Sequence, residues 1–355
     1  MIQPPEIKNI YFAHEADAWL QKWAESQSFS QVFVLCDQHT YHHCFQAWRP
    51  NVPFLASAQV LLIPPGEASK SNHQLQLLWS ALSQAGADRH SLLINVGGGI
   101  TTDLGGLLAA TYMRGIPFVQ VPTSLLAMAD AAVGGKTGIN HSGAKNRVGV
   151  FAAPAAVLIR PAFLDTLPPA EWYSGRAEML KHGLMGDAAH FHAVAAVDFE
   201  QRRMPLELLW RTLALKQAVV AEDPREQGPR KKLNLGHTLG HALESYYART
   251  EQPLRHGHAV ALGLQVALAL SVKHLGLSPG EAEEALQRLR ADYPWPTVPA
   301  PWAALEALLR GDKKNKGTEI RMVLLPHLGE AQTDISLPAA ELRAALEKVR
   351  AGHAL

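Results

Sequence analysis

The chain has 355 residues, of which 47% are hydrophobic and 18% are charged, so it can form two globular domains with ordinary cores. Its formal net charge of +1 argues against a broad nucleic-acid-binding surface. Two cysteines are too few for a disulfide framework. Because the N-terminal residues lack the apolar core of a signal peptide and the longest apolar runs are shorter than a membrane span, we expect a cytoplasmic protein that binds neither nucleic acid nor membrane.

Short β-rich runs alternate with helical stretches in the first half of the chain. Helical apolar spacing covers residues 69–86 and 101–115. Runs typical of buried strands cover residues 31–37, 58–64, 91–99, 117–123 and 155–161. This alternation predicts βαβ units and an N-terminal α/β domain with a Rossmann-like parallel sheet, which binds ligands beyond the carboxyl ends of its strands.

The pattern changes after about Thr166 and becomes mainly helical. Paired prolines at residues 168 and 169 begin a new helix, and we expect the domain boundary there. Helical periods cover residues 167–184, 206–223, 235–248, 257–276, 278–293 and 338–351, with an extended segment at 319–326. The sequence therefore predicts an α/β domain over residues 1–168 and a mainly α-helical C-terminal domain over residues 169–355.

The segment INVGGGITTDLGG is a strand that runs through Gly97, Gly98 and Gly99 into a helix. Glycine lets the backbone approach a phosphate closely, and a helix N-terminus offers N–H groups to an anion. The G-x-G-x-x-G fingerprint is absent, so an ordinary strand–helix turn remains the alternative. Asp37, Glu67 and Lys70 follow strand ends and could bind a ribose, or serve as caps or surface charges.

The segment RKKLNLGHTLGHALE places His237 and His241 on one helix face. A metal site, an anion site and a solvated helix face all remain open for this pair. Glu178, in SGRAEMLKHGL, could complete a catalytic zinc site of one carboxylate and two histidines, with Lys181 on the same face. Spacing alone does not select the histidines, because His256 and its neighbour at 258 also follow.

A third cluster lies in MADAAVGGKTGINHSGAKNRVGVF, where polar side chains stand among glycines. Lys136 follows paired glycines and could bind a phosphate, although the full P-loop spacing is absent. Further cations come later in the chain, at Lys216, Arg230, Lys313 and Lys314. Each alone is typical of surface charge, but together with the metal and nucleotide features they indicate a small substrate with several negative charges.

Six segments resemble, in chain order, the motifs of the 3-dehydroquinate synthase family. They are GGGITTDLGG, VPTSLLAMADAAVGGKTGIN, KNRVGVF, AEMLKHGL, RKKLNLGHTLGHALE and HGHAVALG. The resemblance covers nearly the whole chain, roughly residues 37–314. It implies a homodimeric enzyme of the shikimate pathway, in aromatic amino acid biosynthesis, that uses NAD and a divalent metal, zinc or alternatively cobalt. The implied reaction converts 3-deoxy-D-arabino-heptulosonate 7-phosphate into 3-dehydroquinate and phosphate.

The resemblance also implies roles for individual residues. Its metal ligands fall on Glu178, His237 and His256. Its substrate-binding and catalytic positions fall on Asp130, Lys136, Asn146, Lys181, Lys216, Arg230, Asn234, His241 and one or both of Lys313 and Lys314, with Arg114 contributed across the dimer interface. Its NAD-binding positions fall on Asp37, Glu67, Lys70, Gly97, Gly98, Gly99, Asp103, Thr123, Ser124, Lys136, Lys145 and Thr166.

The implied chemistry accounts for these residue types. Oxidation of the C5 hydroxyl by NAD makes a neighbouring proton acidic, so that phosphate can leave before the hydride returns and the ring closes by an aldol step. Other sugar phosphate cyclases, and metal-dependent polyol dehydrogenases, are the rival interpretations. One departure falls near the metal site: His258 stands where the family commonly carries glutamate.

Overall fold

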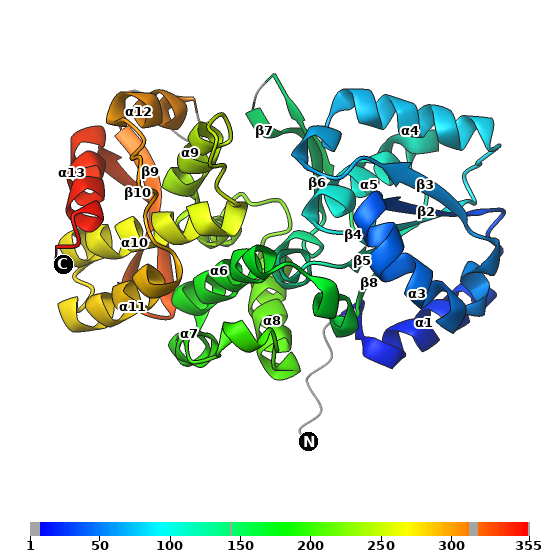
Figure 1. Cartoon of the computed structure of the whole chain (residues 1–355), viewed down its shortest axis with the longest axis horizontal. Helices are drawn as coiled ribbons and strands as arrows, with labels where there is room; N and C mark the ends of the chain where they lie inside the picture. Colours follow the sequence, from blue (N-terminus) through cyan, green and yellow to red (C-terminus); the bar gives the residue numbers. More distant parts are fainter. Residues whose placement is uncertain (1–7, 143, 312–318, 354–355) are drawn as a thin grey trace. The chain divides into compact units, whose positions relative to one another are not determined.

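The computed structural model describes residues 8–142, 144–311 and 319–353. The chain separates into two compact units, Met1–Pro168 (unit 1) and Pro169–Leu355 (unit 2) (Figure 1). The division falls between the paired prolines at residues 168 and 169.

A parallel sheet forms the centre of unit 1. Within the described residues it has six strands, in the order β1-β8-β5-β4-β2-β3, and every pairing is parallel. The strands are β1 (Ile10–Phe12), β2 (Val32–Asp37), β3 (Gln59–Ile63), β4 (Leu92–Gly97), β5 (Phe118–Pro122) and β8 (Ala156–Ile159). β4, β5 and β8 are buried along their whole length. Burial on both faces explains the continuous apolar runs in the sequence, and the predicted parallel α/β sheet is confirmed.

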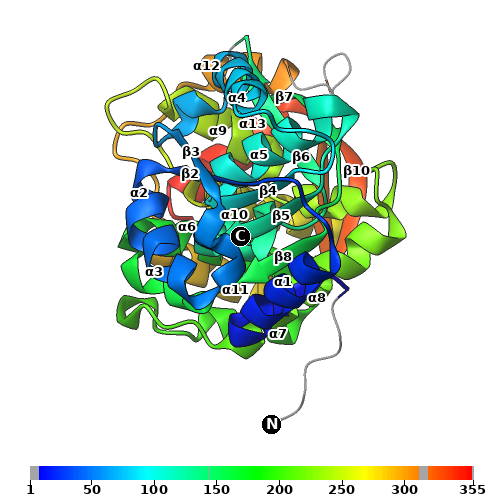
Figure 2. The same ribbon diagram turned by 90° about the vertical axis from the view of Figure 1, so that its right-hand side faces the viewer.

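Helices cover both faces of this sheet. The chain first crosses from β1 to β2 and β3, then returns through β4 and β5 to β8. Because parallel crossovers are right-handed, the two directions place their helices on opposite faces. Accordingly α4 (Asn72–Gln84) and α5 (Gly99–Thr111) lie on one face and α1 (Ala13–Ser26) on the other (Figures 1 and 2). The direction in which the chain crosses the sheet therefore reverses between β2 and β4, which are neighbours in the sheet.

The stretch between β5 and β8 contains an antiparallel hairpin that sequence reasoning did not predict. β6 (Lys136–His141) pairs with β7 (Ala144–Phe151). Glycines in this stretch weaken the sequence signal for a strand, but the pairing of β6 with β7 requires them. A Cβ atom at Gly149 would lie 2.0 Å from the carbonyl oxygen of Thr137, so only glycine allows the strands to approach this closely.

Unit 2 is mainly helical, as predicted. Its helices of eight or more residues, within the described part of the chain, are α6 (Pro169–Gly186), α7 (Ala188–Ala195), α8 (Leu206–Glu222), α9 (His237–Tyr247), α10 (His256–Leu275), α11 (Pro279–Asp292), α12 (Trp302–Arg310) and α13 (Ala339–Arg350). A hairpin of β9 (Glu319–His327) and β10 (Glu330–Pro338) packs with them. Among the described helices, α10 is the one long and apolar enough to cross a membrane, and 67% of its apolar window is buried. Its neighbours α6, α9, α11, α13 and β9 make it the central helix of this core.

Glycines bring α6, α9 and α10 into close contact. A Cβ atom at Gly263 of α10 would lie 1.9 Å from the carbonyl oxygen of Gly236, at the start of α9. At Gly257, in the first turn of α10, it would lie 2.0 Å from the carbonyl oxygen of Ser174 in α6. Side chains on these three helices are therefore held nearer to one another than ordinary helix packing distances allow.

Candidate active site

Three side chains from three helices of unit 2 converge on one point. Glu178 comes from α6, and His237 and His256 are the first residues of α9 and α10. The Nε2 atoms of His237 and His256 lie 3.5 and 3.4 Å from Glu178 Oε1, and the three donor atoms all lie within 4.8 Å of one another. A tetrahedral ion with bonds of about 2.0–2.2 Å holds its ligand atoms about 3.4 Å apart. The donor set therefore fits a divalent metal.

The second nitrogen of each imidazole also has a partner, which orients the ring. His237 Nδ1 lies 3.1 Å from the carbonyl oxygen of Leu235, and His256 Nδ1 lies 3.1 Å from Glu244 Oε2. A carbonyl or carboxylate oxygen requires a proton on Nδ1, so Nε2 is the nitrogen of each ring that a metal ion can take once it carries no proton. This is the tautomer that a metal ion needs.

The electrostatic surroundings differ between the two rings. Burial, with the nearby Lys181 charge, holds the pKa of His237 well below its usual value. Burial also disfavours the charged form of His256, but hydrogen bonds to Glu178 and Glu244 outweigh it and raise the pKa of His256 to about 10. The carboxylates thus create a strongly cation-attracting position at His256 Nε2.

Lys181 and His241 lie beside the three donors. Lys181 Nζ is 2.5 Å from Glu178 Oε2, and both side chains are fully buried. The ring of His241 stands one turn after His237, with centroids 5.1 Å apart, and its centroid is 5.9 Å from that of His256. The structure therefore brings together five of the predicted site residues. They present a metal-binding set flanked by a lysine and a further imidazole.

A second group of predicted residues lies on α8 and on the 3₁₀ turn Pro229–Asn234, which packs against α8 and α6. Lys216 and Arg230 are buried. The Arg230 guanidinium donates to the carbonyl oxygen of Pro224 at 2.6 Å, and Asn234 Nδ2 donates to Glu226 Oε1 at 2.7 Å. Cations at this depth are costly unless anionic groups face them.

In unit 1, the glycine turn lies where the sheet changes direction. Leu35 of β2 is paired with Asn95 of β4, so Asp37 stands level with Gly97 at the carboxyl ends of adjacent strands. The chain leaves these two ends toward opposite faces, which opens the crevice where parallel sheets bind ligands. α5 begins at Gly99, and its N-terminal N–H groups lie at this same edge.

Several predicted cofactor residues at this edge also have local structural partners. The Asp37 carboxylate accepts from Thr40 N at 2.9 Å, and Ser124 Oγ accepts from Ala127 N at 3.2 Å, so both act as caps. Thr123 N donates to the carbonyl oxygen of Gly97 at 3.0 Å. These contacts fix the strand ends around the glycine turn.

A polar network joins the turn after β3 to the β6–β7 hairpin and α5. Lys70 Nζ lies 2.5 Å from both Asp103 Oδ2 and Asn146 Oδ1. Lys145 Nζ lies 3.5 Å from Glu67 Oε1. The predicted cofactor residues of this region and the predicted substrate residue Asn146 are therefore neighbours.

The remaining predicted residues lie on other segments of the chain. Asp130 lies in the π-helical turn Ala127–Ala131, and Lys136 begins β6. Arg114 and Thr166 are exposed, and within the described part of the chain neither makes a hydrogen bond or ion pair with another predicted site residue. Lys313 and Lys314 lie outside the described residues.

Sequence reasoning assigned no role to Glu244, although it follows His237 by seven residues and so shares its helix face. It placed Asn140 in the glycine-rich polar cluster but assigned it no role. The Asn140 amide donates to Glu67 Oε1 at 2.7 Å, and its oxygen accepts from Asn146 N at 3.0 Å.

His258 Nε2 donates to the carbonyl oxygen of Pro294 at 2.9 Å, and its ring packs edge-on against Tyr293. That departure from the family pattern thus serves helix packing.

Most of both units matches the two models of one protein family. Residues 60–174 match the family model described as 3-dehydroquinate synthase N-terminal, and residues 175–315 match the one described as 3-dehydroquinate synthase C-terminal.

Curated relatives and a solved structure agree with these matches. A 3-dehydroquinate synthase of Parabacteroides distasonis is 38% identical over 346 residues, which cover 97% of this chain and 98% of the relative. One of Bordetella pertussis is 42% identical over 293 residues, 81% of this chain and 80% of the relative. A 2-epi-5-epi-valiolone synthase of Streptomyces hygroscopicus, solved with NAD⁺ and Zn²⁺ bound, superposes with a TM-score of 0.85 at 25% identity, over 99% of each chain.

Proposed function

Because the chain belongs to the 3-dehydroquinate synthase family, we propose that it converts 3-deoxy-D-arabino-heptulosonate 7-phosphate into 3-dehydroquinate and inorganic phosphate. The resemblance drawn from the motifs is thereby confirmed, and the protein is an NAD- and metal-dependent enzyme of this family. The observation that carries the proposal for this chain is the convergence of Glu178, His237 and His256 beside Lys181. Three metal-binding side chains next to a buried lysine suit the oxidation of a substrate that carries negative charge.

Glu178, His237 and His256 would hold the divalent ion. Their two imidazoles and one carboxylate leave a position for a substrate oxygen, which is the arrangement of catalytic zinc sites. When bound, NAD⁺ accepts and returns a hydride, and the ion favours loss of the proton from the hydroxyl group that is oxidised. Lys181, 2.5 Å from Glu178, would add positive charge beside that oxygen.

NAD binding is assigned to unit 1. The Gly97–Gly99 turn and the first N–H groups of α5 would receive the pyrophosphate, because glycine exposes the backbone at a helix N-terminus. Asp37 stands level with Gly97 and would accept hydrogen bonds from a ribose. The remaining NAD positions are proposed at Glu67, Lys70, Asp103, Thr123, Ser124, Lys136, Lys145 and Thr166.

The substrate's negative charges call for several cations. Lys216 and Arg230 are buried cations, and a carboxylate or phosphate of the substrate would be attracted to their charges. His241, one turn from the metal ligand His237, would donate to the phosphate. Asp130, Lys136, Asn146, Asn234 and the lysines at 313 and 314 complete the proposed substrate set.

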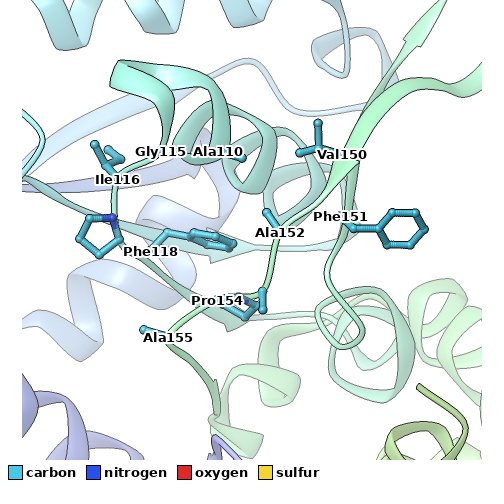
Figure 3. Close-up of a pocket in the computed structure, with 11 residues that line it drawn as sticks. Ala110, Gly115, Ile116, Phe118, Val150, Phe151, Ala152, Pro154 and Ala155 are labelled. Atoms are coloured by element: carbon cyan, nitrogen blue, oxygen red, sulfur yellow. The ribbon is translucent and has the colours of Figure 1, made fainter. Parts of the chain in front are cut away.

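We infer that the enzyme is a homodimer and that a second copy covers an apolar face of unit 1. Val150 and Phe151 of β7 are 41% and 52% exposed. They border a cavity of about 570 Å³ in which the Phe118 ring faces Ala152 (Figure 3). Exposed apolar groups gathered in this way are typical of subunit interfaces. Arg114, whose neighbour Gly115 lines the same cavity, would reach the partner's site from there.

Sedimentation velocity tests the dimer. Phe151→Lys should give monomers at concentrations where the unchanged enzyme is dimeric. Leu206→Lys, at an exposed apolar residue of unit 2, is the matched control and should stay dimeric. A Phe151→Lys variant that sediments as the unchanged enzyme does would contradict this interface.

The reaction itself is tested by measuring phosphate release from the heptulosonate phosphate, with NAD⁺ and zinc, while NADH absorbance is followed. One phosphate and one dehydroquinate per substrate, without NADH accumulation, is the expected result. Absence of phosphate from the zinc- and NAD-loaded enzyme would point to a cyclase for another sugar phosphate. Steady NADH production from a simple polyol would point to a dehydrogenase.

A further inference from the structure

Glu244 is a buried carboxylate that the proposed reaction does not yet use. It lies on α9, two turns after His237, and its side chain is 5% exposed. Its Oε2 atom is 3.1 Å from Nδ1 of His256, which belongs to α10. The opposite nitrogen of that ring, Nε2, faces Glu178 Oε1 at 3.4 Å. The His256 imidazole is therefore held between two carboxylates from two different helices.

The two ligand histidines are oriented in different ways. His237 donates through Nδ1 to a backbone carbonyl, that of Leu235, and needs no side chain for this. His256 is oriented instead by the Glu244 side chain, which belongs to a different helix. A carboxylate is costly to bury, whereas an apolar side chain would serve the α9–α10 packing without that cost. Its contact with His256 Nδ1 suits it to orient that ring.

We propose that Glu244 is a positioning residue of the metal centre, which accepts the Nδ1 proton of His256 and so directs the Nε2 lone pair at the ion. The inference rests on the proposed function, because it presupposes the metal. A carboxylate behind the ring also makes the imidazole a stronger donor, and its charge helps to balance the divalent cation. Metal affinity, and not only turnover, should therefore depend on Glu244.

The test compares zinc dissociation constants, measured against a competing chelator, for the unchanged enzyme, Glu244→Gln and Glu244→Ala. Loss of an outer partner of this kind costs about 10–100-fold in metal affinity, and Glu244→Ala should reach the upper part of that range. Glu244→Gln should lose less, about tenfold, because its amide oxygen can still accept from Nδ1. Glu251→Gln, an exposed residue beyond α9, is the matched control and should bind zinc normally.

The visible spectrum of the Co²⁺-loaded proteins gives a second readout that a purely structural role would not change. A shifted spectrum in Glu244→Gln, at unchanged stability of the metal-free protein, supports the proposal. Should Glu244→Ala not fold, Glu244→Gln decides the matter. Unchanged zinc affinity and an unchanged Co²⁺ spectrum in the folded variants overturn the role of Glu244 alone. Failure of the unchanged enzyme to bind either ion would overturn the proposed function as well.

Discussion

The contact between α10 and α6 allows a sharp test of how the metal centre is positioned. Gly257 follows His256 directly, and Ser174 precedes Glu178 by one helical turn. A Cβ atom at Gly257 would lie 2.0 Å from the carbonyl oxygen of Ser174, and real Cβ contacts essentially never fall below 3.0 Å. Gly257→Ala must therefore move the first turn of α10 away from α6 by about 1 Å.

The expected size of the effect follows from two opposed terms. Overpacking of this kind costs about 1–3 kcal/mol, because the obstacle is helix backbone and cannot rotate away. Alanine is preferred over glycine inside a helix by about 0.5–1 kcal/mol. We expect a net loss of about 1–2 kcal/mol in the free energy of unfolding. A shift of about 1 Å also separates His256 from Glu178 by more than a metal site tolerates, so zinc affinity should fall at least about tenfold.

Denaturant unfolding of the metal-free protein and zinc titration against a chelator measure the two effects separately. Gly280→Ala in α11 is the matched control, because its Cβ would meet nothing closer than Ser278 Oγ at 3.8 Å. That variant should keep its zinc affinity and be as stable as the unchanged protein or more so. If Gly257→Ala matched Gly280→Ala in both measurements, the close α6–α10 contact would not position the metal ligands.

Three further predictions concern single side chains. His237→Ala should lose both bound zinc and turnover, as measured by metal analysis and phosphate release, and full zinc content would contradict its assignment as a ligand. Lys136→Ala should weaken substrate binding more than NAD binding in separate titrations, and unchanged substrate affinity would refute its phosphate role. Burial, and then the Arg211 charge, lowers the pKa of His190 from 6.5 to about 4, so the unfolded state binds the extra proton first as pH falls. Stability should drop by up to about 3 kcal/mol between pH 6.5 and 4, and His190→Gln should flatten that part of the unfolding free-energy profile. An equal pH dependence in the variant would count against a buried neutral His190.

Much of the proposed site could be predicted, because its chemistry depends on residue types and on short spacings along the sequence. A continuous apolar run that ends in Gly97–Gly99 and passes into a helical period predicts a strand, a turn and a helix N-terminus. Two histidines four residues apart at the start of a helix, with a carboxylate motif upstream, allow a metal site, an anion site or a solvated helix face, and their spacing alone does not select the ligands. The motifs then identify the family, and the resemblance implies Glu178, His237 and His256 as the metal ligands, a set that stays a prediction.

Other features depend on contacts between segments far apart in the chain. The β6–β7 hairpin was missed because its glycines, which weaken any strand signal, are needed only where Gly149 meets Thr137 across the pair. Asn140 gained a role only when the hairpin brought it to Glu67.

The sequence by itself determined which side chains can bind a metal, an anion or a dinucleotide, since those capacities belong to residue types and short spacings. Only the tertiary structure decided which of them meet. Glycine contacts draw α6, α9 and α10 together, and this close packing brings one carboxylate and two imidazoles to about the separation that a metal requires. The same packing sets Glu244 behind His256, because a hydrogen bond across two helices is fixed by three-dimensional distance and not by spacing along the chain.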